Sequence, residues 1–536
     1  MDQCNYAQLA ILDCDDQIKT VLMNQPRVLI GRENGGAACD IYLSSSLVSA
    51  RHGVFEFYKG EYYYTDYINV NGTYINGIKI AKNPGEKSSA YKLRDGDILT
   101  IGVSGISRGK TVNIIFSTGV ANNYNWNTFS LMNLNRKITI GRGQNCDIVI
   151  PDIKVSRVHA VVERMGGNAL TISDCKSLNG TILNDSILKP GQVLPFKERD
   201  SVTIGSARLV NLGIAIVYCI PKPVEYKPSN KIPKNEKSIQ LESRRIDLKN
   251  NSDFSDQSYF PKPIERQGGV ELRAEHLTRI VPCKKGTGIN GGDKKYILQD
   301  VSMTIYPGEL VAILGGSGAG KTTFMNAVNG FEPATSGRVF FNGNDLYKNY
   351  QSYKSQIGYV PQQDIVYDNL TMKDMLSYVA QLRLPGDITK SEIEKRVNEV
   401  LSSMALEKQR DTMIKKLSGG QKKRASIAVE LISDPSLFFL DEPTSGLDPE
   451  AETNLMKLLR NLSTQRGKTV IVITHTLQNI HLFDKVVFLA PGGKLCYYGK
   501  PKNALEFFDV DNLSDAYEKI SADVDKYVNK YNSTRF

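Results

Sequence analysis

The pattern of hydrophobic and polar positions changes character along the chain. Residues 1–218 hold short runs in which apolar and polar side chains alternate, such as 54–57 and 160–163, between Gly and Asn turns. Alternation with a period of two is typical of half-buried β-strands. Polar, proline-containing sequence then fills 219–269, and from residue 270 strand-like apolar runs alternate with helical patterns. The sequence therefore predicts an all-β region, a flexible linker at 219–269 and an α/β domain with a mostly parallel sheet.

The all-β region contains an internal repeat. Each copy carries Gly-Arg after an apolar run, then Ser-x-x-His, then Asn-Gly-Thr. The three motifs start at residues 31, 49 and 71 in the first copy and at 141, 156 and 179 in the second. Two copies of one strand-rich pattern predict two consecutive β-sandwiches, at 1–115 and 120–218.

The domain predicted at 270–510 begins with a phosphate-binding motif. The apolar run 310–313 leads into a G-x-x-x-x-G-K-S/T segment, so a buried strand should end in a glycine-rich loop that opens a helix. Backbone N–H groups and the positive helix end would cradle a polyphosphate, Lys321 would neutralise it, and the Thr322 hydroxyl would bind Mg²⁺. We predict nucleotide contacts from Gly315, Gly316, Ser317, Gly318, Ala319, Gly320, Lys321, Thr322 and Thr323.

Further signals follow downstream in a fixed order. A strand at 357–360 is followed by Gln362, a helix opens at Leu-Ser-Gly-Gly-Gln (417–421), and a wholly apolar strand ends on Asp441 and Glu442. Buried strands deliver such carboxylates to the ligand crevice of an open α/β sheet. We also predict a helix capped by Ser391. Its apolar positions recur at helical spacing at Ile393, Val397, Val400, Leu401 and Met404.

Composition excludes only a few classes of protein and of binding partner. The chain has 536 residues, of which 41% are hydrophobic and 23% charged, as in an ordinary globular protein. Its net charge of +10 comes without a long basic tract, so we expect no nucleic-acid partner. The eight cysteines are scattered without a C-x-x-C pair, which argues against a zinc site or a disulfide framework. No run of eighteen apolar residues exists, so we expect this chain not to span a membrane.

The repeated motifs resemble those of the forkhead-associated (FHA) domain, a β-sandwich whose loops bind phosphothreonine peptides. A guanidinium and hydroxyl donors suit a dianionic phosphate. The resemblance implies a phosphopeptide-binding set of Arg32, Ser49, Asn71, Arg142, Ser156, Ser177 and Asn179, in which the arginines and serines hold the phosphate and the asparagines the peptide backbone. His52 and His159 are expected to fix the loops by hydrogen bonds.

The two copies are unequal. The position of Ser177, expected to be a further phosphate donor, holds Asn69 in the first copy. The first copy is therefore expected either to bind more weakly or to act as a packing or dimer surface. A purely structural sandwich is an alternative for both copies.

Residues 270–510 resemble the nucleotide-binding domain of ATP-binding-cassette (ABC) proteins, most closely the exporter branch that includes the ABCG half-transporters. The Leu-Ser-Gly-Gly-Gln segment is close to diagnostic of that class. The resemblance implies that Glu442 is the base for the attacking water, with Gln362 and His475 sensing the γ-phosphate. It implies that Thr322, Gln362 and Asp441 hold Mg²⁺. Ser418, Gly420 and Asp448 would complete an ATP site on a second protomer in a head-to-tail dimer.

These resemblances predict the ATPase subunit of an ABC exporter, with ATP and Mg²⁺ as cofactors. It would work as a homodimer at the inner face of the cell membrane, in the cytoplasm, through a separate ABC-2 type transmembrane subunit. A phosphothreonine protein and a Ser/Thr kinase are implied by the FHA motifs. A soluble ABC ATPase and a phosphopeptide-binding scaffold are the alternatives. The tail at 511–536 is expected to be a helix that either packs on its own domain or docks on the membrane subunit.

Overall fold

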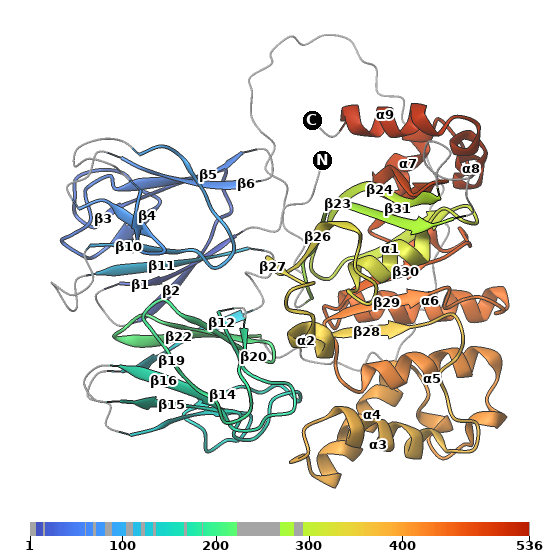
Figure 1. The fold of residues 1–536 in the computed structure, drawn as a ribbon, viewed down its shortest axis with the longest axis horizontal. Coiled ribbons are helices and arrows are strands. Elements are labelled where there is room, and N and C mark those ends of the chain that lie inside the picture. Colours follow the sequence, from blue (N-terminus) through green and yellow to red (C-terminus); the bar gives the residue numbers. More distant parts are fainter. Residues whose placement is uncertain are drawn as a thin grey trace, which may run out of the picture.

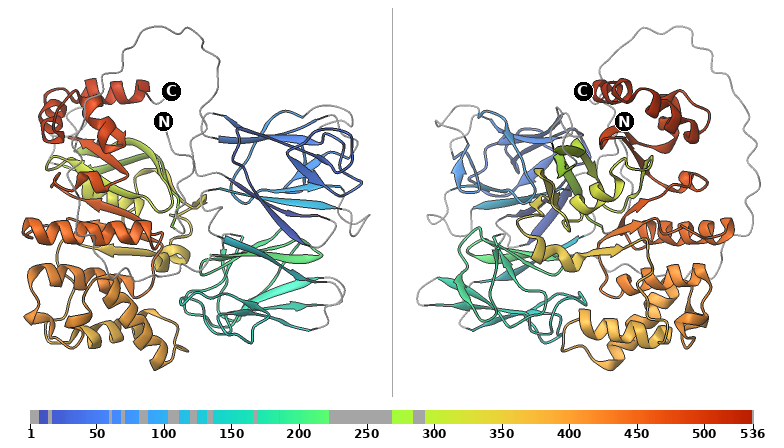
Figure 2. Two further views of the ribbon diagram at one scale, coloured as in Figure 1. Left: turned by 180° about the vertical axis from the view of Figure 1, so that it is seen from behind. Right: turned by 45° about the vertical axis from the view of Figure 1, so that its right-hand side comes forward.

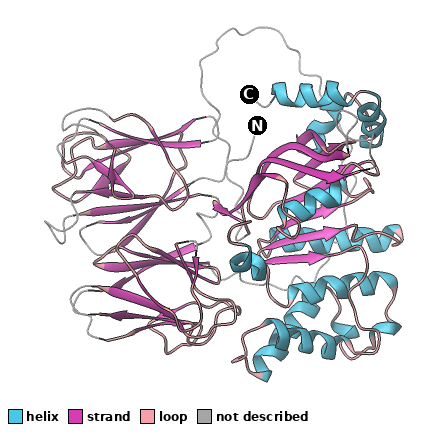
Figure 3. Cartoon of the chain, viewed as in Figure 1, coloured by secondary structure: helices cyan, strands magenta, loops and turns pink. Residues whose placement is uncertain are grey.

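The computed structural model describes residues 7–13, 17–58, 61–67, 71–80, 88–102, 111–118, 124–131, 136–165, 169–184, 186–221, 269–283 and 293–534. Two β-sandwiches are stacked on each other, and both lie on the same side of an α/β domain (Figure 1). The view from behind shows the same arrangement (Figure 2), and the helices of the described residues lie in the α/β domain (Figure 3). The predicted fold class is confirmed. Most of the predicted linker at 219–269 lies outside the described residues.

The first sandwich consists of a six-stranded sheet and a five-stranded sheet. The strand order is β2-β1-β11-β10-β7-β8 in the six-stranded sheet and β4-β3-β5-β6-β9 in the five-stranded sheet. Ile30, Phe55 and Tyr64 are among the buried side chains of its core. Its last strand extends beyond the predicted boundary at 115. The strands are β1 (Gln8–Leu12), β2 (Ile18–Leu22), β3 (Arg27–Arg32), β4 (Ile41–Leu43), β5 (Gly53–Tyr58), β6 (Glu61–Asp66), β7 (Thr73–Ile75), β8 (Ile78–Lys79), β9 (Tyr91–Lys92), β10 (Ile98–Ile101) and β11 (Val112–Ser117).

The second sandwich repeats this plan, with sheets β12-β22-β21-β20-β17-β18 and β14-β13-β15-β16-β19. Its final strand likewise passes the predicted end at 218. The strands are β12 (Tyr124–Ser130), β13 (Ile138–Gly141), β14 (Ile148–Val149), β15 (Ala160–Arg164), β16 (Leu170–Asp174), β17 (Ile182–Leu183), β18 (Ser186–Ile187), β19 (Val193–Pro195), β20 (Ser201–Ile204), β21 (Ala207–Asn211) and β22 (Ala215–Pro221).

The two sandwiches share an apolar contact. Buried side chains of the first, including Leu12 and Ile115, form one cluster with Val210 and Val217 of the second. The Trp126 indole N–H donates to Gln8 Oε1 at 3.0 Å. Burial of this apolar surface holds the sandwiches together as a pair.

The α/β domain is organised around a ten-stranded sheet in the order β27-β26-β23-β24-β32-β31-β25-β30-β29-β28. The strands β28, β29, β30, β25 and β31 pair in parallel, whereas β23, β24, β26 and β27 pair antiparallel. Of the nine neighbouring pairs in this sheet, five are parallel, including β24 with β32, and four are antiparallel, including β31 with β32, so the predicted mostly parallel sheet is a mixed one. The strands are β23 (Leu272–Pro282), β24 (Lys294–Ile305), β25 (Leu310–Gly315), β26 (Ser336–Phe341), β27 (Asn344–Asp345), β28 (Ile357–Val360), β29 (Leu437–Asp441), β30 (Thr469–Ile473), β31 (Lys485–Ala490) and β32 (Lys494–Gly499).

Helices cover this sheet and form a separate layer of α3, α4 and α5 beyond its β28 edge (Figure 1). The helix predicted to open at 417–421 is confirmed as α5. The helices are α1 (Lys321–Val328), α2 (Tyr350–Tyr353), α3 (Met372–Arg383), α4 (Lys390–Ser403), α5 (Gly419–Leu431), α6 (Pro449–Thr464), α7 (Pro501–Phe508), α8 (Leu513–Ala522) and α9 (Val524–Thr534). Short 3₁₀ turns lie at Lys354–Gln356, Glu407–Gln409, Ile414–Lys416 and Ile480–Leu482.

Helix α4 begins two residues earlier than predicted. Thr389, not Ser391, is its N-cap, and a reciprocal capping box joins Thr389 to Glu392. Both positions satisfy Ser/Thr-x-x-Glu, so that pattern alone cannot choose between them. With Thr389 as the cap, Ile388 directly precedes the cap and Ile393 is the fourth residue of the helix. An apolar pair at these two positions is suited to the hydrophobic staple. Ile393 is buried in the core of the domain and the partly buried Ile388 packs against that core, which favours Thr389 as the cap.

The C-terminal segment forms two helices, α8 and α9, in place of the single predicted helix. They pack on their own domain, since Ile520, Tyr527 and Tyr531 join its core. The Tyr527 and Tyr531 rings lie against Phe507. Of the two expectations for the tail, the structure therefore agrees with the one in which the tail packs on its own domain. Among the described residues, none of the helices has the length and apolarity needed to cross a bilayer.

Candidate nucleotide site and phosphate-binding loops

The loop between β25 and α1 has the backbone that its glycines permit. Gly315, Gly318 and Gly320 have positive φ angles of 156°, 74° and 86°. A Cβ atom at Gly315 would lie 2.5 Å from Leu489 O, and one at Gly320 would lie 2.6 Å from Ile297 O. Other residues would therefore be both strained and crowded at these two positions.

Lys321 folds over this loop. Its Nζ donates to Gly315 O at 3.0 Å and to Gly316 O at 3.1 Å. Burial lowers the pKa of Lys321, and the nearby carboxylates of Glu442 and Asp441 act in the opposite direction. The amine thus lies at the loop, as predicted, and can exchange two carbonyl acceptors for phosphate oxygens.

The predicted catalytic side chains meet at the carboxyl ends of three parallel strands, β28, β29 and β30. Glu442 follows β29, and its Oε1 lies 2.7 Å from His475 Nε2. Gln362 Nε2 donates to Glu442 Oε2 at 3.0 Å. Glu442 has a φ of 47°, a left-handed conformation that is uncommon outside glycine and that recurs at functional sites. The structure therefore brings together three residues that are far apart in the sequence.

Asp441 and Thr322 lie beside this group. The Thr322 hydroxyl donates to Asp441 Oδ2 at 3.3 Å. Burial raises the pKa of Asp441, the Thr322 bond opposes that shift, and the charge of Glu442 reinforces it. The Thr322 hydroxyl and the partly desolvated Asp441 carboxylate are two hard oxygen donors that suit Mg²⁺, which usually takes only one or two protein ligands and fills its remaining positions with phosphate and water. The residues present thus fit the predicted magnesium site.

The Leu-Ser-Gly-Gly-Gln segment and Asp448 begin helices. Ser418 caps α5 in a capping box with Gln421, and it is exposed, while Gly420 is partly exposed. Asp448 Oδ1 accepts from the backbone N–H groups of Glu450 and Ala451 at the start of α6. The predicted contacts of these three residues with a second protomer stay predictions.

The predicted phosphopeptide loops have matching frameworks in the two sandwiches. Asn71 Nδ2 donates to Leu47 O at 2.8 Å, and Asn179 Nδ2 donates to Lys154 O at 2.7 Å. The backbone N–H of Arg32 donates to Ser49 O, and that of Arg142 donates to Ser156 O. Each loop set therefore holds its arginine, serine and asparagine in one constellation.

The two loop histidines have the expected structural role. Nδ1 of His52 accepts from Ser49 N, and Nδ1 of His159 accepts from Ser156 N. Burial lowers the pKa of His52 to about 4. Burial also lowers the pKa of His159, against the opposing effects of its bond to Gly180 O and the charge of Asp174. Both rings are therefore neutral braces of their loops near pH 7.

Ser177 is used within its own loop. Its hydroxyl donates to Asp174 Oδ2 at 2.7 Å and accepts from Gly180 N at 3.0 Å. These bonds shape the Asn179 loop, and the part of Ser177 as a phosphate donor stays a prediction.

The side chains of the two arginines have different surroundings. Arg32 is exposed, and within the described part of the chain its guanidinium makes no ion pair. Arg142 is only 14% exposed, and it pairs with Asp387 and Glu392 of the α/β domain. Sequence reasoning did not find this contact, because no local pattern joins residues 250 positions apart.

Comparison with known proteins agrees with these geometries. The family model described as ABC transporter matches residues 298–445, and the FHA domain model matches residues 28–102 and 138–205. The chain carries two FHA domains and an ABC-type ATPase domain. We call the first sandwich FHA1, the second FHA2, and residues 269–534 the ATPase domain.

Two relatives match longer parts of the chain than either family model does. The ABC transporter ATP-binding/permease protein Rv1747 of Mycobacterium tuberculosis is 36% identical over 395 residues, which are 74% of this chain and 39% of that protein. ABC transporter G family member 22 of Arabidopsis thaliana is 36% identical over 283 residues, 49% of this chain and 36% of that protein. This chain thus spans well under half the length of either relative.

Among solved structures, the dimeric post-hydrolysis state of the ATP-binding cassette MJ0796 bound to ADP and Pi is 27% identical. The similar region covers 43% of this chain and 98% of that one, with a TM-score of 0.38.

Proposed function

We propose that this protein is the ATP-binding and ATP-hydrolysing subunit of an ABC exporter. The observation that carries the proposal is the meeting of Glu442 with His475 and Gln362, beside the Lys321 loop and the Thr322–Asp441 pair. Phosphoryl transfer to water requires a glycine-rich loop for the phosphates, oxygen donors for Mg²⁺ and a carboxylate that is held in position.

Each residue has a task in this proposal. Residues 315–323 hold the phosphates of ATP through backbone N–H groups, and Lys321 neutralises them. Thr322 and Asp441 would hold Mg²⁺, with Gln362 as a predicted further ligand, and the bound ion would supply positive charge beside the phosphates. Glu442 orients the attacking water and accepts its proton, since a carboxylate held by two hydrogen-bond partners is fixed in position. His475 and Gln362 keep Glu442 in place.

Completion of the site requires a second copy. Ser418 and Gly420 lie at the exposed start of α5, where backbone N–H groups and the positive helix end favour a phosphate. In the proposed head-to-tail homodimer they cover the ATP of the other protomer, with Asp448 between the two sites. Hydrolysis is then coupled to closure of the dimer.

The remaining partners follow from the domain content. A separate ABC-2 type transmembrane subunit carries the cargo and holds this protein at the inner face of the cell membrane. The FHA domains bind a phosphothreonine protein, the product of a Ser/Thr kinase. The relative named as an ATP-binding/permease protein supports a transport role, because its name joins both parts.

The test is Glu442→Gln, which keeps the shape of the side chain and removes its basicity. ATP hydrolysis by the purified protein should fall by about 10²–10⁴-fold, while ATP binding is retained. Glu518→Gln, an exposed change on α8, is the matched control and should hydrolyse ATP normally. Unchanged hydrolysis by Glu442→Gln would contradict the proposed catalytic centre.

A second experiment addresses the membrane partner. The Glu442→Gln protein, purified with ATP in mild detergent, should retain a polytopic membrane protein that mass spectrometry identifies. Recovery of only ribosomal or other soluble proteins would favour a soluble ABC ATPase instead.

A further inference from the structure

The face of FHA2 that carries Arg142, Ser156 and Asn179 is turned toward the ATPase domain. In Figure 1 the strand β14 of FHA2 lies near α3 and α4, whereas β3 and β4 of FHA1 lie on the far side. Arg142 directly follows β13, so its side chain leaves FHA2 toward the start of α4. What meets the predicted phosphate site is therefore a segment of the same chain.

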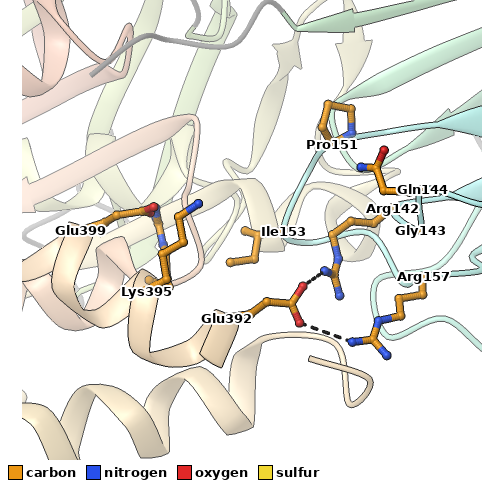
Figure 4. A pocket seen from close by; sticks show the side chains of 10 residues that line it. Arg142, Gly143, Gln144, Pro151, Ile153, Arg157, Glu392, Lys395 and Glu399 are labelled. Atoms are coloured by element: carbon orange, nitrogen blue, oxygen red, sulfur yellow. Dashed lines mark hydrogen bonds and ion pairs between the residues drawn. The ribbon is translucent and has the colours of Figure 1, made fainter. Parts of the chain in front are cut away.

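That segment presents two carboxylates to the phosphate-binding arginine. Arg142 Nη1 donates to Glu392 Oε1, and Arg142 Nη2 lies 3.4 Å from Asp387 Oδ1. The backbone N–H of Arg157 donates to Asp387 Oδ2 at 2.6 Å, and Arg157 Nη2 lies 3.5 Å from Glu392 Oε2. All four carboxylate oxygens thus face FHA2, as Figure 4 shows for Glu392.

This arrangement reproduces the charge of a phosphate. Two carboxylates carry a charge of −2, close to that of phosphothreonine at pH 7. Their partners are a guanidinium fork and a backbone N–H, which are the donors that a phosphate selects. The Thr389 backbone N–H is the chief cause of a Glu392 pKa of about 2, and Arg142 adds to it, so this carboxylate is charged at neutral pH.

The contact extends beyond the arginine. Lys154 Nζ, on a side chain that is almost fully buried, donates to Asp434 O at 3.2 Å. Gln356 Nε2 of the ATPase domain donates to Gly205 O at 3.3 Å. Asp434 precedes β29, the strand that ends on Asp441, so FHA2 touches both the start of α4 and the approach to the catalytic strand.

A cavity of about 520 Å³ borders the ion pairs. Its walls come from FHA2 and from α4, and Figure 4 draws Arg142 and Arg157 reaching Glu392 across it. A competing phosphate can therefore reach Arg142 without passing through a packed core.

We propose that FHA2 binds the Asp387–Glu392 segment of its own ATPase domain as an internal ligand, and that a phosphothreonine peptide competes with this segment for Arg142. The proposal rests on the proposed phosphothreonine recognition by FHA2. Because the internal ligand is tethered, its effective concentration is high and lowers the apparent affinity for any external peptide. A bound phosphopeptide would release α4 and the approach to β29 together.

The test uses the whole chain, with Arg32→Ala in every protein so that FHA1 does not contribute. The probe is a degenerate peptide library with a fixed phosphothreonine, and the same library without phosphate is its control. The variant is Asp387→Asn with Glu392→Gln, which removes both charges; Gln at position 392 still satisfies the capping box. Glu394→Gln is the matched control, since Glu394 lies on the same helix as Glu392 but pairs with Arg410, which follows that helix in the ATPase domain.

Affinity for the phosphorylated library should rise about tenfold or more in the double variant, as expected for coupled sites, and stay unchanged in Glu394→Gln. Adding Arg142→Ala should abolish the gain. Equal affinities of the double variant and the parent protein would overturn the proposal and leave the proposed function intact. Absence of phosphopeptide binding by both proteins would overturn it together with phosphothreonine recognition, while ATP hydrolysis reports separately on the catalytic centre.

Discussion

FHA1 and FHA2 have one fold and one loop framework, yet they face different surroundings. Asn71 and Asn179 make the same bond to the preceding loop, at Leu47 O and Lys154 O respectively. At the two positions where FHA2 contacts the ATPase domain through Lys154 and Arg157, FHA1 has Leu47 and Ala50. The difference teaches that two copies of one loop framework can meet different surroundings where two loop positions differ in charge.

Exchange of Lys154 and Arg157 for the FHA1 residues should have the largest effect on the difference between the two domains. Lys154→Leu with Arg157→Ala gives FHA2 the FHA1 loop and removes a nearly buried amine from the interface. Loss of the nearly buried Lys154 bond to Asp434 O should weaken docking by on the order of 3 kcal/mol, whereas the half-exposed Arg157 side chain should add little. Faster hydrogen exchange in residues 387–392 of the intact chain would report the release.

The reciprocal exchange is its control. Leu47→Lys with Ala50→Arg in FHA1 should leave exchange in residues 387–392 as it is in the parent protein. Persistent protection of residues 387–392 after the FHA2 exchange would mean that other contacts hold the domains together.

Acid should affect FHA1 strongly through His52, whose pKa is about 4 because the ring is buried. A histidine pKa below its unfolded value means that the unfolded chain binds the proton more tightly. The contribution to stability is therefore complete above pH 6.5 and is lost as the pH falls, by about 3 kcal/mol at pH 4. In FHA2 the Gly180 and Asp174 partners of His159 act against this effect.

Nuclear magnetic resonance of labelled histidines checks this directly. The His52 ring should stay mostly neutral from pH 8 down to about pH 5 and should gain its proton near pH 4. Titration near pH 6.5 would instead mean that the ring is hydrated and does not brace the loop.

The arrangement of the candidate nucleotide site could be predicted from the sequence because local motifs encode it. Gly315, Gly320 and Lys321 take the positions that their spacing requires, and Glu442 follows a strand whose apolar run marks it as buried. The order of parallel strands then brings Gln362 and His475 to the same edge.

Other features depend on packing that no local pattern contains. Thr389 caps α4 in place of Ser391, a choice favoured by the packing of Ile393 in the core and of Ile388 against it. The antiparallel part of the sheet arises from pairing between long strands such as β23 and β24. The docking of FHA2 on Asp387 and Glu392 joins segments separated by more than two hundred residues, so neither helical nor strand periodicity could reveal it.

Hydrogen exchange in the unmodified chain, without peptide, tests the contrast between the FHA domains most directly. The loops share the bonds of Val48 N to Ser45 O and of Val155 N to Asp152 O, whereas the Arg157 N–H also donates to Asp387. The Arg157 amide should therefore exchange more slowly than the Ala50 amide, and Asp387→Asn with Glu392→Gln should remove the difference. Equal exchange of the two amides in the unmodified chain would contradict the docked arrangement of FHA2.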